Sequence, residues 1–275
     1  MPTRQLEELI TLAGAARVYD LSFDLYTGIP HFPTHPPFVF GLTKRHGELA
    51  TEFPDGRVGS SSADAIATGT HTGTHLDGLG HFSCNGMLFG GVPTSDQTYE
   101  KGLSKHGIET VGPIFRRGVL LDLARLEGVP SLPKDFAVKP AHLEEACRRQ
   151  GVEIRPGDVV LLRTGWARHW PDPAAYITGG PGNLPTSPGP ELEGAQWLSA
   201  RKIFAAGSDT VAFERVPSLM QVHIHLLVEN GIHIIEVLNL ETLAEDGISE
   251  FLFVALPLRI RGATGSPIRP IALVV

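Results

Sequence analysis

The chain has 275 residues, of which 42% are hydrophobic and 19% charged, proportions typical of a soluble globular protein with a sizeable core. Its 23 basic and 30 acidic residues give a net charge of −7, and the basic residues form no run, which argues against nucleic acid and membrane surfaces as partners. The two cysteines cannot build a disulfide framework, no apolar run reaches the ~18 residues of a membrane span, and the first residues lack a signal-peptide core, so we expect a cytoplasmic protein.

The N-terminal third contains one predicted helix and one predicted loop. Residues 4–13 carry leucine and isoleucine near helical spacing and are followed by Gly14, which predicts a short helix within an N-terminal extension, 1–17. The proline-rich segment 29–37 cannot form a helix or a central strand, because proline fixes φ and lacks an amide donor. We expect an extended loop that presents Phe32, Phe38 and one of His31 or His35.

From residue 118 onward, short apolar runs alternate with amphipathic segments. The apolar runs predict strands at 118–122, 159–163, 203–206, 232–237, 251–260 and 271–275. The amphipathic segments predict helices at 140–150, 191–200, 219–230 and 241–245. This alternation is typical of parallel βαβ crossovers. The glycine- and proline-rich tract 179–190 is expected to be a surface loop flanking a site rather than a linker, so 1–275 is expected to be one domain.

The segment His71–His81 concentrates side chains that bind metals, with three histidines and one aspartate in eleven residues. The surrounding threonines and glycines disfavour a helix, so we expect a strand that runs into a tight turn at Gly73, where His71 and His75 converge. In an extended chain Asp77 would point to the same side as His75. Imidazole and carboxylate groups suit Zn²⁺ or Mn²⁺. Hydrogen-bonded polar residues in a turn would explain one histidine, but not this whole pattern.

The pattern His-x-Gly-Thr-His-x-Asp-x₃-His resembles the signature of the metal-dependent cyclase family, which includes bacterial kynurenine formamidases and isatin hydrolases. The resemblance extends over roughly residues 18–275 and is supported by segments 19–22, 29–33, 158–166, 207–210, 231–236 and 265–270. The expected fold is a single α/β domain with a mixed β-sheet or barrel-like β/β/α (swivelling) core and flanking helices. The resemblance also implies a homodimer or homotetramer.

The resemblance assigns roles within the motif residue by residue. His71, His75 and Asp77 match the positions that bind the first divalent ion, Mn²⁺ or Zn²⁺. His81 matches the histidine that serves as general base or acid, and its reference pKa of ~6.5 suits proton transfer near neutral pH. One ion is expected and two are possible; no nucleotide cofactor is indicated.

The rest of the metal site is left open by the sequence. A second ion would be bridged by Asp77 and held by Glu236 and a histidine of the later helix, either His223 or His225. Because these two histidines are two residues apart, at most one is expected to face the metal. In a one-metal site Gln221 could complete the ligand set instead. Glu236 lies in an apolar strand, where an unpaired carboxylate would be costly, so it needs a metal or another partner.

The resemblance implies a hydrolase that cleaves the C–N amide bond of an arylformamide or cyclic amide, similar to N-formylkynurenine or isatin, by metal-activated water. A flat aromatic substrate would need an apolar wall, for which the candidates are Phe32, Phe82, Phe89 and Trp166. A cyclase, a lyase or a lactone hydrolase would need the same ligands, and a structural metal protein is the non-enzymatic alternative. Asp209 could orient a ligand histidine or cap the next segment.

Overall fold

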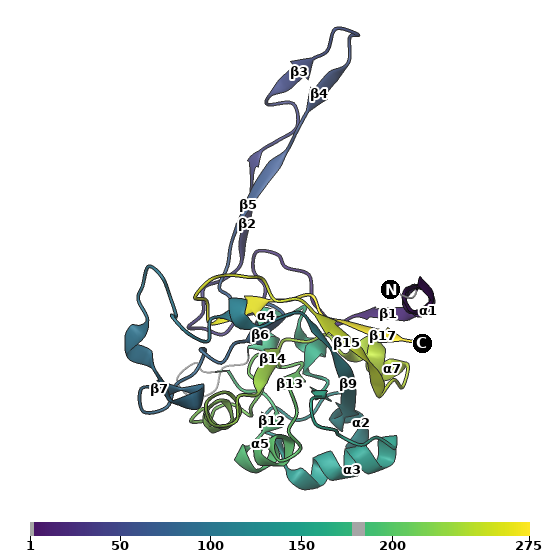
Figure 1. Ribbon diagram of the computed structural model, residues 1–275, viewed down its shortest axis with the longest axis vertical. Coiled ribbons are helices and arrows are strands. Elements are labelled where there is room, and N and C mark those ends of the chain that lie inside the picture. Colours follow the sequence, from purple (N-terminus) through teal and green to yellow (C-terminus); the bar gives the residue numbers. More distant parts are fainter. Residues whose placement is uncertain (1–2, 178–184) are drawn as a thin grey trace.

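A mixed sheet of nine strands runs through the body of the protein (Figure 1), and the computed structural model describes residues 3–177 and 185–275. The strand order is β1-β17-β15-β9-β11-β13-β14-β6-β16. Four central strands are parallel, namely β9 (Ile114–Asp122), β11 (Val159–Arg163), β13 (Ala205–Ser208) and β14 (His233–Glu236). The strands on both sides of them are antiparallel: β15 (Glu250–Ala255), β17 (Ile271–Val274), β1 (Arg17–Asp20), β6 (His75–Asp77) and β16 (Gly265–Pro267).

The central strands are buried on both faces, so alternate residues enter two different cores. Val160 and Leu162 of β11 face the helical side of the sheet. Leu161 faces the other core with Phe251 and Phe253 of β15. The main helices are α2 (Leu123–Leu126), α3 (Pro140–Gln150), α5 (Leu192–Ser199), α6 (Gln221–His223) with the π-helical η6 (Ile224–Glu229), and α7 (Glu241–Glu245). The fold is the predicted α/β class with a mixed sheet and flanking helices.

Shorter elements complete the described chain. They are α1 (Thr3–Ala15), β7 (Met87–Leu88), η1 (Phe89–Gly91), β8 (Val92–Pro93), η2 (Thr94–Asp96), η3 (Ile108–Thr110), β10 (Ala137–Val138), η4 (Trp166–His169), α4 (Pro173–Tyr176) and β12 (Gly189–Pro190). Of the predicted loop 179–190, residues 179–184 lie outside the described part, and β12 pairs with β10 at its end. No described helix is both long and apolar enough to cross a bilayer.

A long hairpin arm, residues 39–67, rises from the body (Figure 1). Its shaft pairs β2 (Val39–Lys44) with β5 (Ala63–Ala67), and its tip pairs β3 (Ala50–Glu52) with β4 (Val58–Ser60). The arm was not predicted from the sequence. Nearly all arm residues are exposed, so the hydrophobic residues among them do not pack into the core of the body.

Several predicted elements agree with the structure, and others have different bounds. The strand predicted at 118–122 begins four residues earlier, as β9, and the helix predicted at 4–13 continues through Gly14 to Ala15. Helix 140–150 and strand 159–163 match α3 and β11. The strand predicted at 203–206 lies two residues later, at Ala205–Ser208, and Gly207 is inside it rather than at its end. Close packing explains the glycine, because a Cβ at this position would lie 2.9 Å from Leu161 and from Leu238. The strand predicted at 251–260 ends at Ala255, ahead of a proline that cannot donate to the ladder. The helix predicted at 219–230 begins at Gln221 and is mostly π-helical.

Candidate metal centre and active site

Strand β6 brings three candidate ligands together, because it lies between β14 and β16 at the edge of the sheet. The register places His75 opposite Glu236. The Nε2 atom of His75 lies 3.5 Å from a carboxylate oxygen of Glu236 and 3.5 Å from Oδ1 of Asp77. All three side chains are buried. His75 and Asp77 therefore point to one side of the strand, as predicted, and Glu236 joins them from the neighbouring strand.

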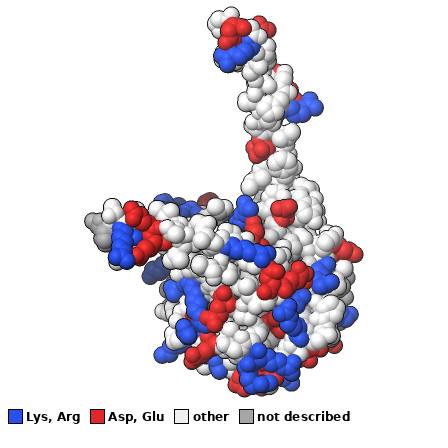
Figure 2. Space-filling model, turned by 90° about the vertical axis from the view of Figure 1, so that its right-hand side faces the viewer, with Lys and Arg blue, Asp and Glu red and all other residues white. Residues whose placement is uncertain are grey.

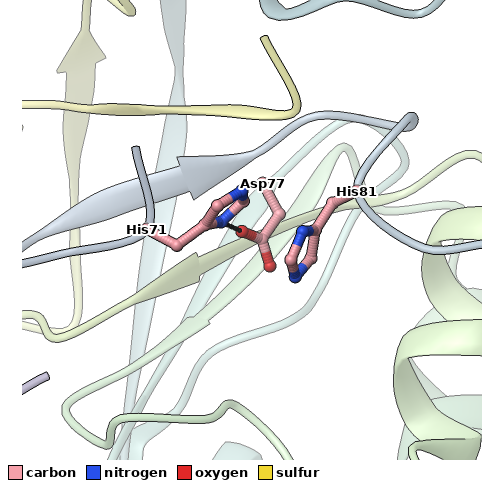
Figure 3. A group of neighbouring side chains, drawn as sticks. All are labelled: His71, Asp77 and His81. Atoms are coloured by element: carbon pink, nitrogen blue, oxygen red, sulfur yellow. Dashed lines mark hydrogen bonds and ion pairs between the residues drawn. The ribbon is translucent and has the colours of Figure 1, made fainter. Parts of the chain in front are cut away.

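His71 approaches the same carboxylate from the loop between β5 and β6. Its Nδ1 lies 2.6 Å from Oδ1 of Asp77, and its Nε2 lies 2.8 Å from Oγ1 of Thr264. The ring of His81 stacks on that of His71 at 3.9 Å between centroids (Figure 3). The turn at Gly73 requires a left-handed backbone, with φ of 71°, which glycine adopts without steric cost. The expected strand does precede this turn, but it ends at Ala67, and the turn leads into β6.

The helix that follows Met220 contributes His223 and not its neighbours. Nε2 of His223 lies 3.4 Å from Oε1 of Glu236 and 3.8 Å from Oδ2 of Asp77. His225 instead contacts Ser199 and Glu229. Gln221 is exposed at the start of α6 and has no described contact with the cluster. Of the three alternatives left open by the sequence, only His223 meets the carboxylates.

Glu214 holds His223 in place and is not among the residues predicted from the sequence. Its Oε1 lies 2.7 Å from Nδ1 of His223 and also accepts a hydrogen bond from the backbone N–H of that residue. A carboxylate behind an imidazole orients the ring and fixes the tautomer that directs Nε2 toward a metal. The sequence gives one weak signal for this role, an acidic residue in the apolar segment 211–216.

The donor set fits a divalent cation. Nδ1 of His75 lies 2.8 Å from the carbonyl of Gly73, which can only accept, so Nε2 carries a lone pair that faces two carboxylates. This Nε2 atom and Oδ2 of Asp77 are buried without a described hydrogen-bond partner. Leaving buried acceptors unpaired costs about 1–3 kcal/mol each, and a cation would satisfy both. Two overlapping groups, His71 with Asp77 and His81, and His75 with Asp77 and Glu236, each place their ligand atoms within 4.8 Å of one another.

The pKa shifts at the site arise from burial and from the charged groups that meet there. Burial would raise the pKa of Asp77, but the imidazoles of His81 and His71 hold it well below its usual range, so the carboxylate is ionised. Burial lowers the pKa of His223, but hydrogen bonds with Glu214 and Glu236 outweigh it and raise the pKa to about 10. Burial lowers the pKa of His81 to about 3, so its imidazole is neutral and has a nitrogen free to accept a proton.

A family model matches residues 19–215 of this chain. The chain belongs to the Cyclase family. This confirms the resemblance that the motif predicts. Among curated relatives, the isatin hydrolase of Roseibium aggregatum is 26% identical over 276 residues, covering 96% of this chain and 94% of that protein. The kynurenine formamidase of Bacillus thuringiensis subsp. konkukian is 26% identical over 255 residues, covering 92% and 95%. A crystal structure of a novel cyclase aligns with a TM-score of 0.83 and 28% identity over 99% of this chain and 91% of its own.

In this Cyclase-family chain, the proline-rich loop adds a fourth histidine to the cluster. The ring of His35 lies 5.3 Å from that of His71 and 6.1 Å from that of His81. The loop prediction for 29–37 is confirmed, and of its two histidines His35 is the one near the motif. Phe38, which the loop was expected to present, is instead buried in a core cluster. Asp209, in contrast, does not orient a histidine, because its Oδ1 accepts from the N–H and hydroxyl of Thr164.

Two of the four aromatic candidates lie beside the cluster. The ring of Phe82 is 5.8 Å from that of His223, and the ring of Phe32 is 5.5 Å from that of His35. Phe89 instead packs against Gly231, and its ring lies 6.2 Å from that of His106. Trp166 is buried in a core cluster, where its indole N–H donates to the carbonyl of Tyr176. The structure therefore does not bring Phe89 or Trp166 to the proposed substrate pocket.

The close approach of β16 to His71 gives a test of His71 as a ligand. A Cβ at Gly265 would lie 2.5 Å from Cε1 of His71 and 2.9 Å from the carbonyl of Leu76. We expect Gly265→Ala to displace the imidazole and to weaken Zn²⁺ and Mn²⁺ binding about 10–100-fold, measured by titration calorimetry. Gly112→Ala, where nothing lies within 4 Å, is the control. Unchanged affinity in a folded Gly265→Ala protein would exclude His71 from the ligand set.

Proposed function

We propose that this protein is a metal-dependent hydrolase that cleaves the C–N amide bond of an arylformamide or a cyclic amide. The observation that carries the proposal is the buried convergence of His75, Asp77 and Glu236, in which His75 Nε2 and Asp77 Oδ2 have no described hydrogen-bond partner, beside the neutral imidazole of His81. The names of the two curated relatives, an isatin hydrolase and a kynurenine formamidase, support the same substrate class.

The residues divide into those that hold an ion and those that handle the substrate. His71, His75 and Asp77 would hold the first ion, Mn²⁺ or Zn²⁺, and Asp77, His223 and Glu236 would hold a second. When bound, such an ion supplies electrophilic activation of a carbonyl group and lowers the pKa of a water ligand. Two surrounding residues keep the donors in place, Thr264 at the far side of His71 and Glu214 behind His223.

His81 is placed to move the proton in amide hydrolysis. Its ring is partly exposed, so it borders the space open to a substrate. As a neutral imidazole it would accept the proton of the attacking water and return it to the departing nitrogen, which would otherwise leave as a poor anionic group. Phe32 lies next to His35 and Phe82 next to His81, and both would contact an aromatic ring of the substrate. An arylformamide would yield formate and an arylamine, and a cyclic amide would open to an amino acid.

We expect His81→Ala to retain its metal and to lose turnover by about 10²–10⁴-fold, because the proton carrier is lost and the proposed ligands remain. Metal content by elemental analysis and kcat on the best substrate are the two readouts. His169→Ala, which removes a histidine whose ring lies against Trp166 in the core, should change neither. A His81→Ala protein with near wild-type kcat would remove His81 from this role.

The function itself is tested by metal analysis joined to a substrate screen. The purified protein is loaded with Mn²⁺ or Zn²⁺ and assayed on N-formylkynurenine, isatin, small lactams and small lactones. Reaction in ¹⁸O-labelled water separates the alternatives, since a hydrolase incorporates label into a carboxylate and a lyase does not. Failure to bind either metal, or label-free product, would contradict the proposal; activity on lactones alone would change the substrate class.

A further inference from the structure

A polar cavity with no assigned role lies behind the metal-binding motif. It has a volume of about 350 Å³, which lies within the range of small-molecule pockets. Three of its lining residues carry side-chain nitrogens: His106, Arg116 and His233. Its apolar lining includes Ile114 and Phe204, and none of the described residues that line it is acidic.

The cavity and the candidate metal centre lie on opposite faces of the sheet. His233 is the first residue of β14 and Glu236 the last, so alternation along the strand turns their side chains to opposite faces. Ile235, which shares the face of His233, belongs to the same core cluster as Ile114, and Phe204 packs against that cluster. An occupant of the cavity would therefore be separated from a substrate at the metal centre.

The cavity nevertheless reaches the back of the metal-binding motif. Nδ1 of His233 lies 2.9 Å from the backbone carbonyl of Asp77. Leu79, two residues further on, lines the cavity itself. A Cβ at Gly80 would lie 3.0 Å from the backbone carbonyl oxygen of His106. Contacts made in the cavity would therefore act on the segment that carries the metal ligand and the proton carrier.

Arg116 supplies the cavity with a positive charge that no carboxylate neutralises. Its guanidinium lies over the ring of Phe204, 4.0 Å from the centroid, and donates to the carbonyl of Gly157 at 3.3 Å. It forms no ion pair with a residue in the described part of the chain. Glu109, close by in sequence, accepts from the N–H of Gly262 instead. On the face drawn in Figure 2, by contrast, basic and acidic side chains are intermixed over the body.

The two imidazoles of the cavity add hydrogen-bond acceptors. Each gives one ring N–H to a backbone carbonyl, His233 to that of Asp77 and His106 to that of Phe89, because a carbonyl can only accept. In a neutral ring the other nitrogen then carries a lone pair. Neither Nε2 of His233 nor Nδ1 of His106 has a described hydrogen-bond partner. Both are therefore able to accept an N–H or O–H of an occupant.

We propose that this cavity binds a small carboxylate with an apolar body and an N–H or O–H donor, and that the occupant restrains the motif from behind. The carboxylate would pair with Arg116. The apolar body would lie against Ile114 and Phe204, and the donor would reach the imidazoles. A hydrogen bond to Nε2 of His233 polarises the ring and strengthens the bond from its Nδ1–H to Asp77. This site is separate from the proposed hydrolysis and does not depend on it.

Titration calorimetry on the full-length protein as purified tests the site without any measurement of activity. The probes are the three isomers of aminobenzoate, which carry a carboxylate, an aromatic body and an amine. Benzoate lacks the donor and aniline lacks the carboxylate. We expect at least one aminobenzoate to bind ~10-fold more tightly than both benzoate and aniline, because each of the two smaller probes leaves one polar partner of the cavity unpaired.

Two variants locate the binding. Arg116→Gln removes the charge, and His233→Asn removes Nε2 while its amide can still donate to the carbonyl of Asp77. Each should weaken aminobenzoate binding at least ~10-fold. Arg259→Gln is the matched control and should bind like wild type, because Arg259 is exposed and lies outside the cavity. Circular dichroism establishes that each variant is folded.

Hydrogen exchange measured by mass spectrometry tests the link to the motif. The amides of Gly78 and His81 donate to the carbonyls of Thr264 and Gly78. A bound aminobenzoate should slow exchange in this segment at least ~3-fold in wild type and leave it unchanged in Arg116→Gln. Aminobenzoates that bind no more tightly than benzoate and aniline, or that bind Arg116→Gln as tightly as wild type, would overturn the site. Binding with unchanged exchange would overturn the link.

Discussion

Replacing Asp77 by asparagine should abolish metal binding and reduce turnover by at least ~1000-fold, because this carboxylate is the one residue shared by both candidate ligand groups. It contacts His71 at 2.6 Å, His75 at 3.5 Å and His223 at 3.8 Å. Asparagine keeps an oxygen that can accept from Nδ1 of His71, but it removes the negative charge and replaces the other oxygen with an NH₂ group. That group offers a hydrogen where a cation needs a lone pair.

The matched control is Asp209→Asn, the same substitution at another fully buried aspartate. Asp209 also has an Oδ2 atom without a described hydrogen-bond partner, but its Oδ1 binds Thr164 rather than a histidine. Metal content and kcat should be unchanged in this control. Measured stoichiometry by elemental analysis and kcat/KM on the best substrate decide the comparison. An Asp77→Asn protein that keeps its metal would show that the carboxylate is not a ligand.

Replacing Arg163 by methionine should destabilise the protein by about 3–5 kcal/mol, because the buried Asp122 and the partly buried Glu241 would lose their closest cation. Arg163 lies at the end of β11 and donates to Asp122 at 2.8 Å and to both oxygens of Glu241 at 2.9 Å. Burial would lower the pKa of the guanidinium, but these hydrogen bonds raise it above its ordinary value, so the charge is permanent. Urea denaturation measures the free energy of unfolding.

Arg168→Met provides the comparison, because Arg168 approaches the same Glu241 at 3.5 Å from a side chain that is 51% exposed. Exposed ion pairs contribute about 0–1 kcal/mol, so this variant should unfold almost like wild type. Equal, small losses in both variants would show that the buried network around Arg163 contributes little. The effect is expected to be on stability alone, and metal binding should be unchanged in the folded Arg163→Met protein.

The part of the site that lies within a short stretch of chain could be predicted from sequence. His71, His75 and Asp77 span seven positions, so local geometry alone brings them together. Glu236 could be suspected because an unpaired carboxylate is costly in an apolar strand. Its meeting with His75, however, depends on the pairing of β14 with β6, which are far apart in the chain. Glu214 gave only a weak signal, because a carboxylate that positions a histidine is recognised by its contact with that ring.

The features that the sequence could not predict depend on tertiary context. The rotation of the helix after Met220 determines whether His223 or His225 faces the carboxylates. No local signal in the sequence indicates where an α-turn changes to a π-helix. Gly207 resembles a strand terminator, but close packing against Leu161 requires it inside β13. The body of the protein does not cover the arm, so the arm's sequence shows no alternation of buried and exposed positions that would predict its strands. Patterns of burial predict only the surfaces that a single chain buries.

The π-helix η6 has a consequence for how this site tolerates changes in chain length. Its hydrogen bonds span five residues rather than four, so it takes up about one residue more per turn than an α-helix. Because η6 lies between His223 and Glu236, deleting one residue from it would restore an α-turn and leave both side chains where they are. We therefore expect related sequences to differ by single insertions or deletions here. A motif with a fixed interval between these two positions would miss such relatives.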